Sequence, residues 1–278
     1  MIGYITDEDE FLARAAPDPD VRLRYGPHPD QFGELFLPRL EPGRHAPVAV
    51  LLHGGFWKAQ YDLRHMSGFA TALTRSGIAA WSVEYRRGTR DAGWRETHAD
   101  VAAGAAHLAT VARRWPIDLT RVVIVGFSSG GQLALAVGPP ADRRICVRAI
   151  VSLAGVLDLA SAASLGLGGD AVVAFLGGSR AERPDAYRLA CPSERPASRV
   201  PRLVVHGERD TIVPASLSER YAVQARRRGD PVTLRVLPTG HFELVDPRSD
   251  VWPAIEEPIR QLLDSEPAGV PGQYRYSP

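Results

Sequence analysis

Residues 122–131 have the sequence VVIVGFSSGG, and this stretch decides the fold. The four apolar residues VVIV are typical of a strand covered on both faces, as in a parallel sheet. They lead into a G-x-S-x-G pattern at residues 126–130, which a helix-like run follows at 132–137. A strand, a tight turn and a helix in this order expose the serine at the end of a sheet. We therefore predict Ser128 to be a nucleophile; the alternative is a phosphate-binding turn, but the lysine of such a loop is missing here.

Strand and helix patterns alternate on both sides of this stretch. Apolar runs predict further strands at residues 48–52, 78–83, 149–153, 203–205 and 232–237. Helical spacing separates these runs, so residues 20–265 are predicted to form one α/β domain with a mostly parallel central sheet flanked by helices. Residues 21–25 and 32–37 alternate in polarity and predict an antiparallel entry pair.

Other segments break this rhythm. Residues 155–200 are rich in Gly, Ala, Ser and Pro, and we interpret them as a small cap insertion, with an ordinary long connection as the alternative. Residues 1–19 and 266–278 are interpreted as N-terminal and C-terminal arms. Two helix starts are predicted from capping boxes, one with Thr97 and Asp100 and one with Ser216 and Glu219.

A serine nucleophile needs a base and a group that orients the base, and the expected chain order is Ser, acid, His. Asp210 follows the apolar run at 203–205, and His241 follows the run at 232–237. We predict a catalytic triad of Ser128, Asp210 and His241, with Glu208 as a rival acid. His206 ends a strand and is predicted to be structural.

A second motif, HGGFW at residues 53–57, directly follows the predicted strand at 48–52. Glycines at this point let the backbone approach an oxyanion, which needs N–H donors aimed at it. The backbone N–H of Ser129 is predicted to be one donor of this oxyanion hole. The alternative is a glycine turn beside a buried tryptophan. Residues 84–87 (EYRR) are predicted to form ion pairs of the scaffold.

With these motifs, the chain resembles the α/β-hydrolase superfamily. Within it, HGGFW is similar to the HGGxW signature of the kynurenine formamidase (arylformamidase) group and its bacterial esterase relatives. The resemblance covers about residues 20–265 and includes GFSSGG, HGERD and GHFELVDP. It implies an α/β-hydrolase fold and the main-chain amides of Gly55 and Phe56 as further oxyanion donors. It also implies N-formylkynurenine as a possible substrate.

The predicted activity is hydrolysis of a small carboxylic ester or amide through an acyl-enzyme, without a cofactor. An acyltransferase or a cyclase with the same triad is one alternative, and a non-catalytic binding protein on this fold is another. Trp57, Trp94 and Phe242 are candidate substrate-binding residues, with packing in the core as the alternative.

The composition argues against several classes of binding partner. Lys plus Arg is 33 and Asp plus Glu is 32, so no charge excess favours nucleic acid or an anionic membrane. The histidines form no H-x-H or H-E-x-x-H pair, so a metal site is not expected. Cys146 and Cys191 are interpreted as free thiols, and the acidic N-terminus lacks a signal-peptide pattern, so a cytoplasmic location is predicted. The sequence leaves monomer and homodimer open.

Overall fold

The computed structural model describes Phe11 and residues 16–88 and 92–265. Eight strands form one sheet in the order β1-β2-β4-β3-β5-β6-β7-β8. Strands β3 to β8 run parallel, while β2 pairs antiparallel with both β1 and β4. The strand bounds are β1 Val21–Arg24, β2 Phe32–Phe36, β3 Ala46–Leu52, β4 Ala79–Val83, β5 Ile117–Phe127, β6 Val147–Leu153, β7 Arg202–Gly207 and β8 Val232–Leu237. The predicted parallel sheet and its antiparallel entry pair are both confirmed.

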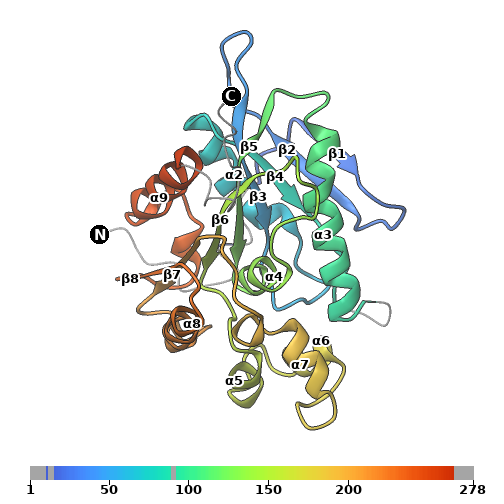
Figure 1. Ribbon diagram of the computed structural model, residues 1–278, viewed down its shortest axis with the longest axis vertical. Helices are drawn as coiled ribbons and strands as arrows, with labels where there is room; N and C mark the ends of the chain where they lie inside the picture. Colours follow the sequence, from blue (N-terminus) through green and yellow to red (C-terminus); the bar gives the residue numbers. More distant parts are fainter. Residues whose placement is uncertain (1–10, 12–15, 89–91, 266–278) are drawn as a thin grey trace, which may run out of the picture.

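Helices cover both faces of this sheet (Figure 1). The longer helices are α2 (Ser67–Arg75), α3 (Trp94–Val111), α4 (Ser129–Val137), α8 (Ser216–Arg227) and α9 (Trp252–Asp264). Short 3₁₀ turns occur at η1 (Leu63–Met66), η2 (Pro192–Glu194) and η3 (Phe242–Leu244). The architecture is that of an α/β-hydrolase, as predicted.

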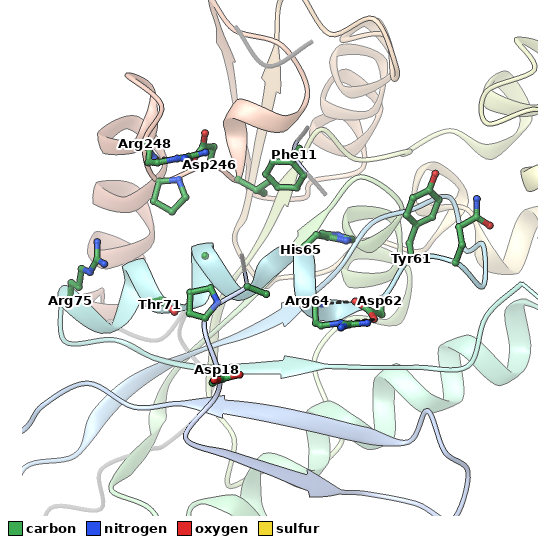
Figure 2. A pocket seen from close by; sticks show the side chains of 16 residues that line it. Phe11, Asp18, Tyr61, Asp62, Arg64, His65, Thr71, Arg75, Asp246 and Arg248 are labelled. Atoms are coloured by element: carbon green, nitrogen blue, oxygen red, sulfur yellow. Dashed lines mark hydrogen bonds and ion pairs between the residues drawn. The ribbon is translucent and has the colours of Figure 1, made fainter. Parts of the chain in front are cut away.

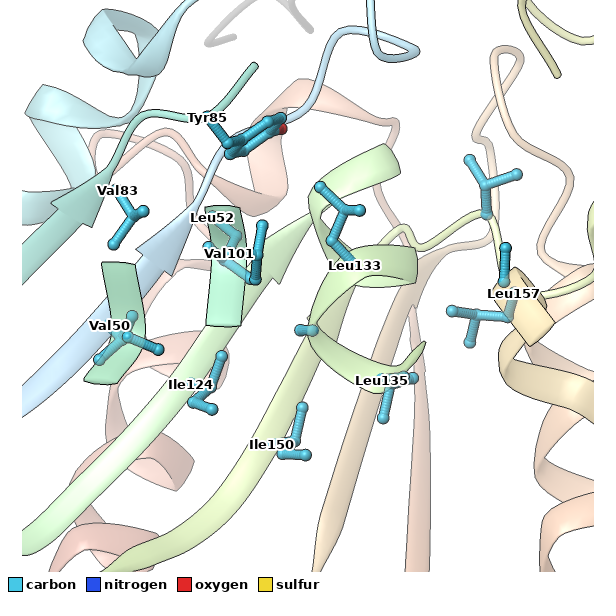
Figure 3. Close-up of a cluster of buried hydrophobic side chains, with 14 of the residues drawn as sticks. Val50, Leu52, Val83, Tyr85, Val101, Ile124, Leu133, Leu135, Ile150 and Leu157 are labelled. Atoms are coloured by element: carbon cyan, nitrogen blue, oxygen red, sulfur yellow. The ribbon is translucent and has the colours of Figure 1, made fainter. Parts of the chain in front are cut away.

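The apolar strands divide the core into two layers because successive side chains point to opposite faces. On one face, Val50, Ile124 and Ile150 pack against α3, α4 and α8; Figure 3 shows part of this layer. On the other face, Leu51 and Val123 pack against α2 and α9. The central strands are therefore rigid, and they hold the loops at their carboxyl ends in place.

The connection between β6 and β7 contains three short helices, α5 (Leu159–Ser164), α6 (Ala171–Leu176) and α7 (Pro184–Ala190). They gather at one end of the molecule, at the bottom of the view in Figure 1. Val172, Phe175 and Tyr187 of this segment are buried in the core layer on the α4 side. The segment is thus packed helical structure and not an irregular loop.

Both predicted capping boxes are wrong. Helix α3 begins at Trp94, and the Gly93 N–H donates to Glu96 Oε2 at 3.1 Å. Thr97 lies inside the helix and donates to the Arg86 carbonyl, while α8 begins after Ala215 without a side-chain cap. At α3 the polar side chains of the expected cap make tertiary contacts instead, since Asp100 pairs with Arg86. The predicted C-terminal arm, residues 266–278, lies outside the described residues.

Candidate active site

The turn between β5 and α4 holds Ser128 in an unusual conformation. Its φ is 54° and its ψ is −119°, a region that residues other than glycine rarely adopt. The Ser128 N–H donates to the Leu153 carbonyl at 2.8 Å, and the Gly131 N–H donates to the Ser128 carbonyl at 2.9 Å. Strain of this kind costs about 1–3 kcal/mol and is concentrated at functional sites. The fold therefore maintains a strained serine at the N-terminus of α4.

Two glycines make this turn possible by close approach. A Cβ at Gly126 would lie 2.1 Å from the Gly130 carbonyl oxygen, and a Cβ at Gly130 would lie 2.1 Å from the Leu52 carbonyl oxygen. Both obstacles are backbone atoms, which do not move aside easily. The glycines of the G-x-S-x-G pattern are thus needed for packing between β3, β5 and α4.

Asp210 and His241 are brought together by the ends of two neighbouring strands, β7 and β8. Asp210 Oδ2 accepts a hydrogen bond from His241 Nδ1 at 2.6 Å. Asp210 Oδ1 accepts from the N–H groups of Ile212 at 2.9 Å and Val213 at 2.8 Å. Burial opposes ionisation, but the hydrogen bonds from His206 and His241 outweigh it and hold the pKa of Asp210 well below its usual range. The carboxylate is therefore charged and fixes the tautomer of His241 with a proton on Nδ1.

His206 is a structural residue, as predicted, and it also supports the acid. Its Nδ1 lies 2.7 Å from Ser218 Oγ, and its Nε2 lies 2.7 Å from the Val213 carbonyl oxygen and 3.1 Å from Asp210 Oδ2. The side chain of His206 is completely buried. Glu208, the rival acid, is exposed, while the Asp210 side chain is completely buried.

Ser128 and His241 line the same pocket, which has a volume of about 380 Å³. The His241 ring also contacts Phe127, with ring centroids 4.8 Å apart. Within the described part of the chain, Ser128 Oγ and His241 Nε2 are not joined by a hydrogen bond. Such bonds are often long in unliganded enzymes and tighten when substrate binds. The structure thus brings the predicted nucleophile Ser128 and the predicted base His241 to one pocket, with His241 held by Asp210.

The HGGFW segment forms a tight loop beside Ser128. Gly55, Phe56 and Trp57 have φ values of 108°, 50° and 56°, and the Lys58 N–H closes the turn on the Gly55 carbonyl at 3.0 Å. The N–H groups of Gly55, Phe56 and Ser129 have no acceptor among the described residues. Unpaired N–H groups beside a nucleophile are suited to receive a negatively charged oxygen. All three are the donors expected from the sequence.

A buried network holds this oxyanion loop, residues 53–58, from behind. The Glu84 carboxylate accepts from His53 Nε2 at 3.0 Å and from the N–H groups of Leu63 at 3.1 Å and Tyr85 at 2.8 Å, and it pairs with Arg87. The Tyr85 hydroxyl donates to the His53 carbonyl at 2.7 Å. The predicted scaffold role of residues 84–87 is therefore confirmed. The carboxylate is a central anchor because four groups depend on it.

His65, from η1, is a positioning residue that the sequence did not reveal. The Gly54 N–H donates to His65 Nε2 at 3.2 Å. Burial, assisted by the nearby His53, lowers the pKa of His65 to about 3, so its ring is neutral at physiological pH and its nitrogen can accept this bond. No motif surrounds His65 in the sequence, and only the fold brings η1 against the oxyanion loop.

The three candidate substrate-binding residues differ in position. Phe242 lines the pocket, and its ring stacks on that of Phe11 with centroids 5.0 Å apart. Trp57 is 1% exposed and does not line the pocket; it stacks on Phe175 at 4.3 Å, and its Nε1 donates to Gln132 at 3.0 Å. Trp94 lies in the first turn of α3, beside His98, and also outside the pocket lining. For Trp57 the structure supports the core alternative, whereas Trp94 is half-buried and packs against the edge of the core.

Residues from the cap segment and the N-terminal region complete the site. Gly166, Leu167 and Gly168 line the pocket from the loop after α5. Phe11 and His65 also line a neighbouring larger cavity, shown in Figure 2, where Arg64 pairs with Asp62. In the sequence, the glycines at 166–169 indicate that another part of the chain can approach closely here, whereas no sequence pattern marks Phe11.

The described part of the chain offers no metal site, no membrane-spanning helix and no disulfide. The described residues contain no group of three or more His, Cys, Asp or Glu side chains arranged to bind a metal ion. None of the helices in the described ranges has the length and apolar character required to span a bilayer. Neither cysteine in the described region forms a disulfide; Cys146 is half-buried and Cys191 is buried.

Comparison with known families identifies the chain. The model of the BD-FAE family matches residues 34–224, more than half of the sequence. The chain belongs to the BD-FAE family. The match begins in β2 and ends in α8, so it includes the oxyanion loop, Ser128 and Asp210 but not His241.

This BD-FAE protein is similar to two curated esterases of Mycobacterium tuberculosis (strain ATCC 25618 / H37Rv). It is 25% identical to Esterase LipC over 81% of its own length and 60% of the relative's. It is 27% identical to Esterase LipQ over 73% of its own length and 52% of the relative's. The chain thus spans little more than half of these relatives.

Among solved structures, Esterase B from Lactobacillus rhamnosis superposes with a TM-score of 0.77 at 17% identity, over 92% of this chain and 89% of that one. A bacterial heroin esterase superposes with a TM-score of 0.70 at 21% identity, over 88% and 84% of the two chains. At these identities the likeness establishes the shared α/β-hydrolase fold.

Proposed function

We propose that this chain is a serine hydrolase that cleaves a small carboxylic ester through an acyl-enzyme. The observation that carries the proposal is the pocket itself. It places the strained Ser128 beside His241, whose Nδ1 is held 2.6 Å from Asp210 Oδ2. Similarity to Esterases LipC and LipQ supports the same class of reaction.

In the first half-reaction, Ser128 Oγ attacks the ester carbonyl carbon while His241 Nε2 takes the hydroxyl proton. The carbonyl oxygen becomes an oxyanion, which the N–H groups of Gly55, Phe56 and Ser129 stabilise. The intermediate then collapses to an acyl-enzyme, and His241 gives its proton to the departing alcohol. Asp210 stays ionised throughout and stabilises the transient imidazolium.

In the second half-reaction, water replaces the alcohol. His241 removes a proton from water, the hydroxide attacks the acyl carbon, and a second oxyanion forms in the same place. Collapse releases the carboxylic acid and returns the proton to Ser128. Removing one oxyanion donor typically costs about 10²–10³ in rate, so the preformed loop accounts for a large part of the expected catalysis.

The test is hydrolysis of p-nitrophenyl acetate by the wild type and by Ser128→Ala, together with labelling by a fluorophosphonate probe. We expect the variant to lose at least 10³-fold in kcat and all labelling. Equal activity of the two proteins would refute the proposal. Failure of the probe to label the wild type would favour a non-catalytic binding protein. Product formed with an added amine or alcohol in place of water would identify an acyltransferase.

A narrower proposal concerns the amide N-formylkynurenine. The HGGFW loop supports it through its similarity to the arylformamidase signature, and the pocket is lined by aromatic rings such as Phe56, Phe127 and Phe242. The test compares kcat/KM for N-formylkynurenine with that for short esters of similar size. A value no higher than that of a generic ester would remove the formamidase assignment while leaving the esterase proposal intact.

A further inference from the structure

Lys58 is the single lysine in the 278 residues, and it lines the catalytic pocket. The other basic side chains that line this pocket are the imidazoles of His65 and His241. Burial lowers the pKa of His65 to about 3, which leaves that ring uncharged at physiological pH. The lining contains neither aspartate nor glutamate among the described residues. Lys58 is therefore the residue that brings a formal positive charge to the lining of this pocket.

The described residues leave the ammonium group of Lys58 without a partner. The hydrogen bonds of Lys58 are made by its backbone, with its N–H donating to Gly55 and its carbonyl accepting from Tyr61 at 3.3 Å. Its ammonium group forms no ion pair or hydrogen bond with the described residues. By contrast, two of the three arginines that line the neighbouring cavity, Arg64 and Arg248, pair with Asp62 and Asp246. An anion that enters the pocket can therefore form a charge-assisted hydrogen bond with this ammonium group.

The loop also holds Lys58 in a defined position. Trp57 is anchored in the core by Phe175 and Gln132, and the residues on either side of it, Phe56 and Lys58, line the pocket. Lys58 thus belongs to the same rigid turn that carries the oxyanion donors. An anion bound by this lysine would lie within reach of its side chain from this turn, in the same pocket as Ser128.

We propose that Lys58 is a specificity-determining residue that binds a carboxylate carried by the ester substrate. This inference rests on the proposed hydrolase function and narrows its substrate class to monoanionic esters. The rest of the lining is apolar or aromatic, with Phe127, Leu167 and Ile212 among it, and it accommodates the body of such a substrate. A hydrogen bond to a charged group contributes enough to change kcat/KM by about 10- to 100-fold.

The experiment uses two matched substrate pairs at pH 7.5. The pair 4-acetoxybenzoate and 4-acetoxybenzamide places the carboxylate, or its neutral counterpart, on the leaving group. The pair monoethyl succinate and ethyl butyrate places it on the acyl group, with acid release followed by pH-stat. The readout is the ratio of kcat/KM for the anionic and the neutral member of each pair, which removes general effects on catalysis.

For at least one pair we expect the ratio to fall about 10- to 100-fold in Lys58→Met. We expect it to be retained within about threefold in Lys58→Arg, which keeps the charge. The control Arg113→Met removes an exposed cation just after α3, outside the pocket, and is expected to leave the ratios unchanged. Added salt is expected to lower the wild-type ratio because it screens the charge.

Unchanged ratios for both pairs in Lys58→Met would overturn the inference, as would an equal fall in Lys58→Arg. If the wild type still hydrolyses p-nitrophenyl acetate through Ser128, either result would leave the hydrolase proposal standing. A wild type that cleaves none of the esters would instead contradict the proposed function itself.

Discussion

Replacing Asp210 with asparagine tests the electrostatic logic of the site with almost no change in shape. Oδ1 of Asp210 accepts two backbone N–H bonds, so the amide oxygen of the new side chain is expected to occupy that position. Its NH₂ group then faces His241 Nδ1, where a carboxylate oxygen now lies 2.6 Å away. Two N–H donors repel each other, so His241 must carry its proton on Nε2 instead.

That tautomer cannot accept the proton of Ser128. Loss of the correct tautomer in a triad of this kind typically lowers kcat by about 10⁴-fold, which corresponds to about 5 kcal/mol of activation free energy. The binding of a neutral ester does not depend on this proton, so KM is expected to change by less than about fivefold. The effect therefore falls on kcat.

The assay is p-nitrophenyl acetate hydrolysis at pH 7.5, with Ser128→Ala as the background. Asp142→Asn, which removes a carboxylate paired with Arg144 on the surface, is the matched control and is expected to retain full activity. A loss of less than tenfold in Asp210→Asn would refute the role assigned to this carboxylate. A large rise in KM without a change in kcat would refute it equally.

The same variant has a stability signature. The pKa of Asp210 is lower in the folded state than the unfolded value of about 4. This carboxylate therefore stabilises the fold fully above pH 4, and the contribution is lost as the pH falls through the folded pKa. Urea unfolding between pH 3 and 7 is expected to show a smaller decline toward low pH in Asp210→Asn than in the wild type.

Four further variants test the support of the oxyanion loop and of the turn that holds Ser128. His65→Gln, whose side-chain oxygen can accept the same hydrogen bond, is expected to keep kcat within about tenfold, whereas His65→Leu is expected to lose more activity. The folded pKa of His65 is about 3, so protonation of the unfolded state lowers the stability of the wild type from pH 6.5 downward. Urea titrations of His65→Gln are expected to show less of this decline. Glu84→Ala leaves Arg87 buried without its partner and is expected to lower the free energy of unfolding by about 3–5 kcal/mol in urea; a loss below 1 kcal/mol would contradict the anchoring role. Gly130→Ala places a Cβ 2.1 Å from the Leu52 carbonyl oxygen and is expected to shift α4 and reduce kcat about 10²-fold, and near-normal fluorophosphonate labelling rates would contradict this.

Local patterns were sufficient to predict the strands and the tight turn at Ser128. The run VVIV at 122–125 is apolar on both faces, and this property belongs to the segment itself, because a strand between two helix layers has no solvent-facing side. A side chain at Gly126 would meet the backbone of Gly130 within the same turn, so this requirement is also local, whereas the need for glycine at 130 comes from β3. Helix starts were less predictable, since Thr97 has a tertiary alternative to capping and α8 begins after Ala215 without a side-chain cap.

Contacts between distant segments were decided by the three-dimensional packing. The aromatic ring of Trp57 suits a substrate-binding role, yet this ring stacks on Phe175, 118 positions later, in the core. His65 carries no motif, and its role arises because η1 lies against the Gly54 amide. Lys58 stands out in the sequence as the single lysine, but its proposed role follows from its position in a pocket whose described lining contains no acid. Sequence patterns predict the local structure that a segment prefers. A functional site depends instead on which side chains remain unpaired in the folded protein, and contacts between distant segments decide this.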